Sequence, residues 1–345
     1  MKIKEFCKIL TNKKIDVAFF VNPDPSITYF TQVDVGFSIL CITSDSVDFY
    51  LNKLDKVKTS KQITIHKLNK NWKKELSSKK WKIIGINKDN ITLSFFEQLK
   101  LMYPKSKLVD ISKDLIKLRK IKTSFEIKKL KEAGKITSHV YLNFIENYTS
   151  KKFPTEQSIS FFLEKKIKEN GHNLAFPTIV GCGKNTSIPH HKTSTFKIKK
   201  GFIQIDFGAV YQNYNSDMSR VLYVGKPNKI EKEKYELLLN CQQKAIKNIS
   251  KNKTFKSVCK SVRNDLGKES SYFIHSLGHG VGIEIHEAPR VNVESEETIK
   301  EGMVFTIEPG IYYPNKFGLR IEDTLSFSSN KTKRLTKATK ELIKL

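Results

Sequence analysis

Three of the eight histidines in this sequence fall within twelve residues, from His275 through His279 to His286. Histidine is the side chain that most readily moves protons near neutral pH, and it is a common metal ligand. The spacing of the first two histidines matches a zinc-binding H-E-x-x-H helix, but Ser276 stands where that motif has glutamate. Glycines at positions 278, 280 and 282 also disfavour a helix here. The cluster therefore points to metal or acid–base chemistry without a zincin helix.

Four acidic residues lie in apolar segments that are predicted to be strands or strand ends. They are Asp206, Asp217, Glu308 and Glu322. An ionised carboxylate buried alone costs on the order of several kcal/mol, so each of these acids needs a cation or hydrogen-bond donors. For any single acid, a strand end that pairs with a lysine is the simpler interpretation. Four of them together with the histidine cluster favour two divalent metal ions that share bridging carboxylates.

Sequence motifs of several other enzyme classes are absent. The segment Gly181-Cys-Gly-Lys184 lacks the spacing of a phosphate-binding P-loop, and the chain has no G-x-S-x-G nucleophile motif. The glycines around His279 are not framed by the strand–turn–helix unit of a dinucleotide-binding motif. Metal-assisted chemistry is therefore the best-supported reading of the candidate site.

The elements that must position these residues divide into two regions. In the first third, short apolar runs alternate with helical patterns, and His, Cys and acidic residues do not cluster there. We expect strands at 16–21, 37–42, 47–51 and 82–86, and helices near 2–14, 70–78 and 91–102. The later region is predicted to have helices that begin after Thr123 and Thr155, strands over 176–225, helices near 229–250 and 254–267, and strands through about 327. We place the domain boundary at residue 118, giving domains 1–118 and 119–345.

Composition limits the partners. The chain of 345 residues is 39% hydrophobic, which is enough apolar side chain for sizeable cores. Its net charge of +27 comes almost entirely from lysines spread along the whole chain, and only six basic residues are arginine, so we expect no specific nucleic-acid partner. No apolar run approaches the roughly 20 residues that span a bilayer. The five cysteines are scattered without a C-x-x-C pair, so we expect a cytoplasmic protein without a membrane partner.

The candidate ligands and their surroundings resemble the pita-bread metallopeptidases, family M24. The motifs that carry the resemblance are Asp206-x10-Asp217, His279 in H-S-L-G-H-G-V-G, Glu308 in T-I-E-P-G and Glu322 in R-I-E-D-T. The similarity is greatest to the Xaa-Pro peptidases, namely prolidase (Xaa-Pro dipeptidase) and aminopeptidase P (Xaa-Pro aminopeptidase). Residues 1–118 resemble the creatinase-type N-terminal domain more loosely, through Asn22-Pro-x-x-x-Ile27-x-Tyr29-Phe. The resemblance implies an α/β (α+β) fold in which this domain precedes a pita-bread catalytic domain.

The resemblance also implies a metal-binding role for each of the five positions. Asp206 would bind one ion, His279 and Glu308 would bind the other, and Asp217 and Glu322 would bridge both. A carboxylate-rich set with one histidine suits manganese or cobalt, and zinc and iron are also compatible with it. Two such ions about 3.5–4 Å apart would acidify a bridging water and polarise the scissile carbonyl.

Catalytic and substrate-binding roles follow from the same resemblance. Glu308 would relay a proton to the leaving amine, and His286 would donate a hydrogen bond to the oxyanion. His190 would bind substrate near the leaving group, although His191 stays an alternative because the segment from Pro189 to Asp206 is one residue shorter than usual in the family. The remaining pocket positions are His275, Tyr312 and Arg320.

The leading hypothesis is therefore dinuclear, metal-dependent hydrolysis of the bond before proline, in Xaa-Pro dipeptides or at the N-terminus of short peptides. A methionine or broad-specificity aminopeptidase is one alternative, although such enzymes normally lack the N-terminal domain. A non-catalytic pita-bread module that binds protein or RNA is another, although such modules typically lose some ligands and all five are present here. The sequence leaves open the preferred peptide length, the native metal and the oligomeric state; family members often dimerise through the N-terminal domain, which implies a homodimer.

Overall fold

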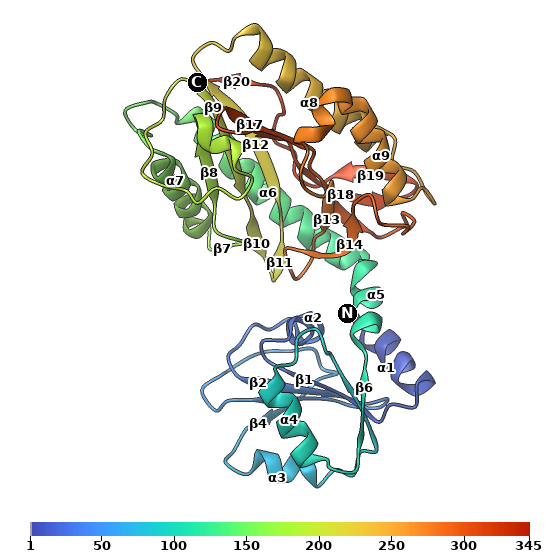
Figure 1. The fold of residues 1–345 in the computed structure, drawn as a ribbon. Helices are drawn as coiled ribbons and strands as arrows, with labels where there is room; N and C mark the ends of the chain where they lie inside the picture. The colour runs from blue at the N-terminus through green and yellow to red at the C-terminus, as the bar shows by residue number, and fades with distance from the viewer. Residues whose placement is uncertain (1) are drawn as a thin grey trace. The chain divides into compact units, whose positions relative to one another are not determined.

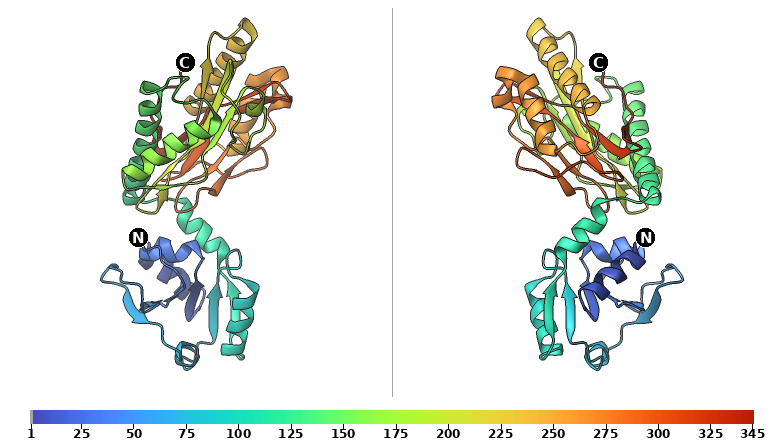
Figure 2. Two further views of the ribbon diagram at one scale, coloured as in Figure 1. Left: turned by 90° about the vertical axis from the view of Figure 1, so that its left-hand side faces the viewer. Right: turned by 90° about the vertical axis from the view of Figure 1, so that its right-hand side faces the viewer.

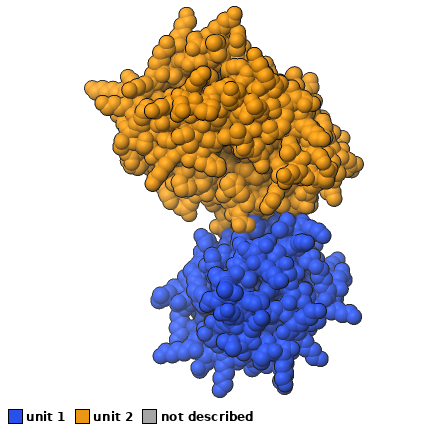
Figure 3. All heavy atoms as spheres, in the orientation of Figure 1, with its two compact units in different colours: residues 1–119 blue, residues 120–345 orange. Residues whose placement is uncertain are grey.

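The computed structural model describes residues 2–345, and the chain divides into two compact units, Met1–Arg119 and Lys120–Leu345 (Figures 1 and 3). The division falls at the end of helix α5 (Ser112–Lys120), the same helix in which the sequence analysis places its boundary. Each unit has its own sheet and its own buried apolar residues. Within residues 2–345, none of the helices combines the length and the apolar character that a membrane crossing requires.

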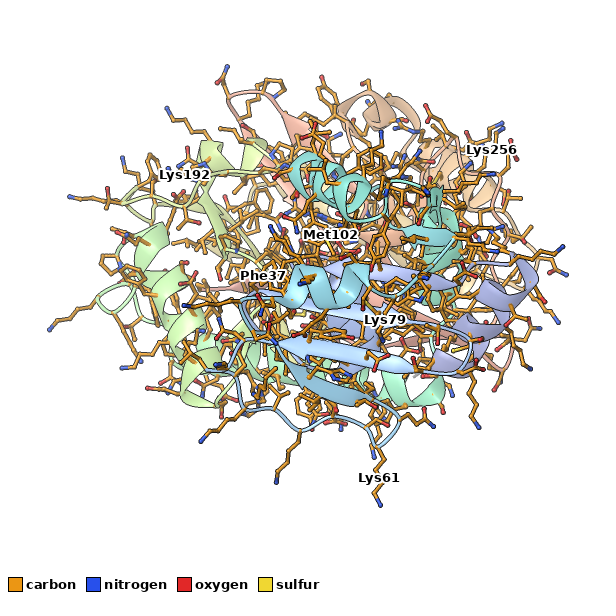
Figure 4. The ribbon with its side chains drawn as sticks, turned by 90° about the horizontal axis from the view of Figure 1, so that it is seen from below. Phe37, Lys61, Lys79, Met102, Lys192 and Lys256 are labelled. Carbon is orange, nitrogen blue, oxygen red and sulfur yellow. The ribbon has the colours of Figure 1, made fainter. Side chains whose placement is uncertain are left out.

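Unit 1 is built on a six-stranded mixed sheet with the order β4-β3-β2-β1-β5-β6. Its strands are β1 (Val17–Val21), β2 (Ser38–Ile42), β3 (Val47–Leu51), β4 (Thr64–Lys67), β5 (Ile83–Ile86) and β6 (Lys107–Asp110). Its other helices are α1 (Ile3–Asn12), α2 (Pro25–Thr31), α3 (Trp72–Ser77) and α4 (Leu93–Met102). The chain between β3 and β4 lies at the surface, where the side chain of Lys61 extends outward (Figure 4).

The central strand β1 is buried along its whole length because helices cover both faces of the sheet. Successive side chains of a strand point to opposite faces. Phe19 accordingly packs against Phe95 of α4, with 5.9 Å between the ring centroids. Phe20 packs on the other face, against Phe6 of α1 and Phe30 of α2. A fully apolar run such as 17–21 is what a strand covered on both faces requires.

Unit 2 contains two larger sheets and two smaller ones. The first has the order β20-β12-β9-β8 and consists of β8 (Ile179–Cys182), β9 (Gly201–Phe207), β12 (Met218–Val224) and β20 (Ile343–Lys344). The second has the order β14-β13-β15-β18-β19 and consists of β13 (Gly278–Gly280), β14 (Glu287–Val291), β15 (Val304–Ile307), β18 (Asp323–Ser328) and β19 (Lys331–Arg334). The smaller sheets are β7 (Asn173–Leu174) with β10 (Ala209–Tyr211) and β11 (Tyr214–Asn215), and β16 (Gly310–Tyr313) with β17 (Phe317–Arg320).

Two pairs of helices cover the sheets of unit 2 (Figures 1 and 2). They are α6 (Ser124–Glu146) with α7 (Glu156–Glu169), and α8 (Lys229–Lys247) with α9 (Phe255–Leu266). The alternation along β12 shows how both pairs are anchored: Leu222 packs in the cluster formed by α6 and α7, whereas Val221 and Tyr223 pack in the cluster formed by α8 and α9. Two 3₁₀ helices, η1 (Gly183–Ser187) and η2 (Gly267–Tyr272), connect these elements.

The predicted helix starts in unit 2 are confirmed. Thr123 caps α6 in a capping box, in which its hydroxyl accepts from the backbone N–H of Glu126 and the Glu126 carboxylate accepts from the backbone N–H of Thr123. Thr155 caps α7 in the same way, with its hydroxyl accepting from the backbone N–H of Ser158. Gly171 follows α7 with φ +76°, the left-handed conformation that commonly ends a helix.

Candidate active site

The five predicted metal ligands converge from strand ends of both large sheets in unit 2. Asp206 lies in β9, Asp217 directly precedes β12, His279 lies in β13, Glu308 directly follows β15 and Glu322 directly precedes β18. Antiparallel pairing brings the ligands of each sheet together, since the register places Asp206 beside β12 and the end of β15 beside the start of β18. Strand pairing thus brings Asp206 near Asp217 and Glu308 near Glu322, and the two sheets meet where the backbone N–H of Glu322 donates to the backbone oxygen of Ser219 over 3.2 Å.

The approach of β13 to β15 depends on glycine. A Cβ atom on Gly278 would lie 2.1 Å from the backbone oxygen of Thr306, so only glycine fits at this contact. The close approach allows the backbone N–H of His279 to donate to the hydroxyl of Thr306 over 3.0 Å. That hydroxyl in turn donates to Oε1 of Glu308, also over 3.0 Å. One threonine therefore orients two of the candidate ligands.

The ligand atoms lie close enough for a shared cation. Nε2 of His279 lies 3.5 Å from Oδ2 of Asp217 and 3.3 Å from Oε1 of Glu308. Ligand atoms of Asp217, His279 and Glu322 all lie within 4.8 Å of one another, the arrangement expected of residues that can hold one metal ion. Nδ1 of His279 donates to the backbone oxygen of Gly280 over 3.1 Å, which leaves the Nε2 lone pair available to a metal.

Three carboxylate oxygens in this site are buried without a hydrogen-bond partner among residues 2–345. They are Oδ1 of Asp206, Oδ1 of Asp217 and Oε1 of Glu322. A buried oxygen left unpaired costs about 1–3 kcal/mol, and more when it is charged. Hard, oxygen-rich ligand sets of this kind suit divalent cations such as Mn²⁺. The donor set and its unpaired oxygens therefore fit a divalent metal centre.

Arg320 and Ser219 hold the second carboxylate oxygens of Asp206 and Glu322. Nη2 of Arg320 donates to Oδ2 of Asp206 over 2.5 Å, and Nε donates to the hydroxyl of Ser219 over 2.9 Å. The Ser219 hydroxyl then donates to Oε2 of Glu322, also over 2.9 Å. In Asp206 and Glu322, one oxygen is thus fixed by protein donors and the other is left for a cation.

Electrostatics of the site shows the same need for cations. Burial and the neighbouring carboxylates, Glu322 first, raise the pKa of Asp217. Burial and the carboxylates of Glu308 and Asp206 raise the pKa of Glu322, and burial raises the pKa of Glu308 to about 7. Burial lowers the pKa of His279, which favours the neutral imidazole that metals bind. These acidic side chains are crowded into a buried space, where their ionised forms are favoured only beside a positive charge.

The structure places His275, Tyr312 and Arg320 in one hydrogen-bonded chain beside the metal ligands. Nη1 of Arg320 donates to the hydroxyl of Tyr312 over 2.9 Å, and that hydroxyl lies 3.0 Å from Nε2 of His275. Nδ1 of His275 lies 2.7 Å from the backbone oxygen of Ser276, so Nδ1 carries the proton and Nε2 accepts from Tyr312. Burial lowers the pKa of His275 to about 4, which keeps this histidine neutral near pH 7.

His286 lies against the candidate ligand His279. Its ring lies edge to face with that of His279, with 4.2 Å between the ring centroids. Burial, followed by the effect of His279, lowers the pKa of His286. The next residue, Glu287, forms a buried ion pair in which its Oε1 lies 2.8 Å from Nζ of Lys122. This pair fixes the chain beside His286.

The structure separates the two adjacent histidines that the sequence leaves as alternatives. The backbone oxygen of Pro189 accepts from Arg320 over 3.2 Å, and His190 contributes, after burial, to the lowered pKa of both His275 and His286. The side chain of His190 is exposed. The neighbouring His191 turns away, and its Nε2 lies 2.8 Å from Oε2 of Glu156.

Sequence reasoning missed the residues that orient the ligands. Ser219 pairs directly opposite Asp206 in the antiparallel register, and Thr306 lies two residues before Glu308. Side chains two apart on a strand share a face, so a serine or threonine two residues from a candidate ligand is a usable signal. Glu156, which lies far from the ligands in sequence, offered no comparable local signal.

Comparison with known proteins agrees with this geometry. Residues 128–328 match metallopeptidase family M24, and residues 2–121 match the creatinase/prolidase N-terminal domain. An Xaa-Pro dipeptidase of Pyrococcus horikoshii is 36% identical over 352 residues, covering 99% of this chain and 98% of that protein. An Xaa-Pro dipeptidase of Pyrococcus furiosus is 35% identical over 353 residues, covering 99% of each protein.

Solved structures resemble the whole chain. The prolidase from Pyrococcus horikoshii OT3 superposes with a TM-score of 0.91 at 34% identity, covering 99% of both chains. The X-Pro aminopeptidase from Thermotoga maritima MSB8 superposes with a TM-score of 0.89 at 29% identity, covering 96% of this chain and 98% of that one.

A two-domain chain with a buried carboxylate–histidine centre of this kind is a metal-dependent hydrolase. This chain belongs to metallopeptidase family M24. The predicted fold class, a creatinase-type N-terminal domain followed by a pita-bread catalytic domain, is confirmed.

Proposed function

We propose that this protein is a dinuclear Xaa-Pro dipeptidase that hydrolyses the peptide bond before proline in Xaa-Pro dipeptides and at the N-terminus of short peptides. The observation that carries the proposal is the cluster of Asp217, His279 and Glu322, whose ligand atoms lie within 4.8 Å of one another, together with three buried carboxylate oxygens that lack a hydrogen-bond partner among residues 2–345. Asp206 would hold one ion, His279 and Glu308 would hold the other, and Asp217 and Glu322 would be shared by both. The names of the Pyrococcus relatives support the same substrate class.

The other catalytic roles belong to side chains of this protein. Two divalent cations held in this site would supply an acidified water and polarise the scissile carbonyl. Glu308, oriented by the Thr306 hydroxyl, would take up the proton of the attacking water and pass it to the departing proline nitrogen. His286 donates to the oxyanion that develops on the carbonyl oxygen, a contact that stabilises the transition state. His190 binds substrate on the leaving-group side.

Selectivity for proline follows from the shape of the bond. A bond before proline is a tertiary amide without an N–H, and the ring restricts φ beside the reacting carbon. The pocket must therefore accept the ring and hold the substrate through its carboxylate or next carbonyl. We assign these contacts to His190, His275, Tyr312 and Arg320, of which the last three form one hydrogen-bonded chain.

An Xaa-Pro aminopeptidase that acts on longer peptides is the second candidate. The similarity to the Thermotoga maritima X-Pro aminopeptidase, over 96% of this chain, supports this second candidate. Both candidates share the proline-dependent chemistry and differ only in the length of the substrate beyond proline. We also propose manganese as the native metal, because the ligand set has four carboxylates and one imidazole, and a homodimer as the assembly, by analogy with the family.

A cleavage assay tests the proposal and separates the candidates. Protein loaded with Mn²⁺, Co²⁺ or Zn²⁺ is given Leu-Pro, Leu-Pro-Gly and the matched peptides Leu-Ala and Leu-Ala-Gly. We expect the proline peptides to be cleaved far faster than the alanine peptides. A preference for Leu-Pro over Leu-Pro-Gly supports the dipeptidase, and the reverse supports the aminopeptidase. Equal hydrolysis of proline and alanine peptides would instead establish a general aminopeptidase, and no hydrolysis with any of the metals would favour the non-catalytic module.

A further inference from the structure

The first residue of helix α7, Glu156, is fully buried and binds a segment of chain that lies beside the active site. Its Oε1 accepts from the backbone N–H of Cys182 and from Nδ2 of Asn185, both over 2.8 Å. Its Oε2 accepts from Nε2 of His191 over 2.8 Å, and from the backbone N–H and the hydroxyl of Ser194 over 3.2 and 2.8 Å. Five donors from one segment of the chain, residues 182–194, thus share a single carboxylate.

This carboxylate has no lysine or arginine partner within residues 2–345, and His191 is its one titratable contact. A buried carboxylate that lacks a strong cation must be stabilised by hydrogen bonds from donors held in place. The first turn of a helix also favours a negative charge, because its backbone N–H groups point outward. The Glu156 carboxylate keeps these hydrogen bonds only if residues 182–194 hold one conformation.

The same segment is attached to the metal site on its other side. The backbone oxygen of Pro189 accepts from Arg320, which also holds Asp206. The hydroxyl of Thr186 accepts from the backbone N–H of Gly318 over 2.8 Å. His190 therefore lies between two fixed neighbours, with Pro189 bound to the active-site arginine and His191 bound to Glu156.

We propose that Glu156 is a positioning residue for His190. Its carboxylate, acting through His191 and Ser194, fixes the backbone that presents the exposed imidazole of His190 to the substrate. The proposal rests on the proposed function, in which His190 contacts the peptide. It also gives the two adjacent histidines different tasks: His190 faces the substrate, and His191 is part of the support.

A double-mutant cycle tests this assignment with Leu-Pro as substrate. Glu156→Gln keeps the side-chain shape but replaces one acceptor with an NH₂ group, which cannot accept from His191 or Ser194. A displaced contact residue commonly costs about ten- to a hundredfold, so we expect a loss in kcat/KM of that size in the otherwise native protein. In the His190→Ala background, the same substitution should change kcat/KM by less than about twofold, because the group being positioned is gone.

Matched measurements distinguish positioning from general destabilisation. Glu169→Gln, at the other end of the same helix and exposed, is the control and should leave kcat/KM unchanged. Metal content by elemental analysis should be the same in all variants, since no metal ligand is altered. If Glu156→Gln does not fold, Ser194→Ala removes one of the five contacts and takes its place in the cycle. If turnover of a variant is too slow to measure, the double-mutant cycle is built from the Kd values of a Leu-Pro analogue with a reduced peptide bond.

Two results would overturn the proposal. One is that Glu156→Gln lowers kcat/KM by the same factor in the native and His190→Ala backgrounds, which would mean that Glu156 acts independently of His190. The other is a loss of bound metal in the Glu156 variant. An unmodified protein that does not hydrolyse Leu-Pro would refute the proposed function instead, and the two failures are therefore told apart by the first measurement.

Discussion

Removing the metal ions should destabilise this protein, and the loss should grow as the pH rises. In the metal-free site, burial raises the pKa of Glu308 from 4.5 to about 7, and the pKa values of Asp217 and Glu322 are raised as well. A carboxyl group whose pKa is higher in the folded state binds more protons there than in the unfolded chain. The contribution of each such carboxyl group to stability must therefore fall as the pH rises through the window between its two pKa values.

The size of the effect follows from the pKa of Glu308. A rise from 4.5 to about 7 corresponds to about 3 kcal/mol, at roughly 1.4 kcal/mol per pKa unit. Asp217 and Glu322 act in the same direction. For a unit of the size of Lys120–Leu345, each kcal/mol shifts the melting temperature by about 2–4 °C, so Glu308 alone gives about 6–12 °C between pH 4.5 and pH 8. Bound cations cancel the repulsion and should restore most of this loss.

Differential scanning calorimetry on chelator-treated and Mn²⁺-loaded protein, at pH 5 and pH 8, measures the effect directly. The stabilisation by Mn²⁺, taken as the difference in melting temperature between the two forms at one pH, should be larger at pH 8 than at pH 5. Glu308→Gln is the control, since it removes one titrating group and should reduce the pH dependence of the metal-free protein. A stabilisation by Mn²⁺ that stays constant or falls between pH 5 and pH 8 would refute the reasoning.

Two further predictions concern individual side chains. Glu308→Gln should lower kcat for Leu-Pro by orders of magnitude. His286→Ala should also lower kcat but keep its metal ions, because the contact of His286 belongs to the transition state. If elemental analysis shows that the His286 variant has lost metal, His286 is a ligand instead. Lys122→Met should lower the free energy of unfolding, measured with urea, by about 3–5 kcal/mol, because it removes the ammonium that neutralises the buried Glu287 carboxylate. A loss below 1 kcal/mol would show that this ion pair does not stabilise the fold.

Features that depend on neighbours in sequence could be predicted. The apolar run 17–21 predicted strand β1, and the T-x-x-E pattern at Thr123 predicted the start of α6, because both depend on residues a few positions apart. The strand β4 could not be predicted in this way, since most of its residues are exposed and the segment has no apolar alternation. Helix α2 has only seven residues, too few for a helical period to show.

In the candidate site, the ligands could be predicted from the sequence, but the contacts that orient the residues around them could not. The five ligands stand in apolar segments with a recognisable spacing, so the sequence could single them out. The difference between His190 and His191 could not be predicted, because it depends on Glu156, which lies 35 residues before His191 and meets it only in the folded chain. Ser219 likewise meets Asp206 through strand register, and Arg320 meets it from another sheet, so neither contact could be read from proximity in sequence.

The five ligands come from two sheets that are hydrogen-bonded separately, and this has a consequence for the dynamics of unit 2. Asp206 and Asp217 belong to the β9–β12 sheet, whereas His279, Glu308 and Glu322 belong to the β13–β15–β18 sheet. A cation bound to both sets adds a cross-link between the sheets to the hydrogen bond that the backbone N–H of Glu322 donates to the backbone oxygen of Ser219 over 3.2 Å. Backbone amides of β9 and β15 should then exchange hydrogen for deuterium only after the metal has left, so the two sheets open as one cooperative unit when loaded and as two when empty.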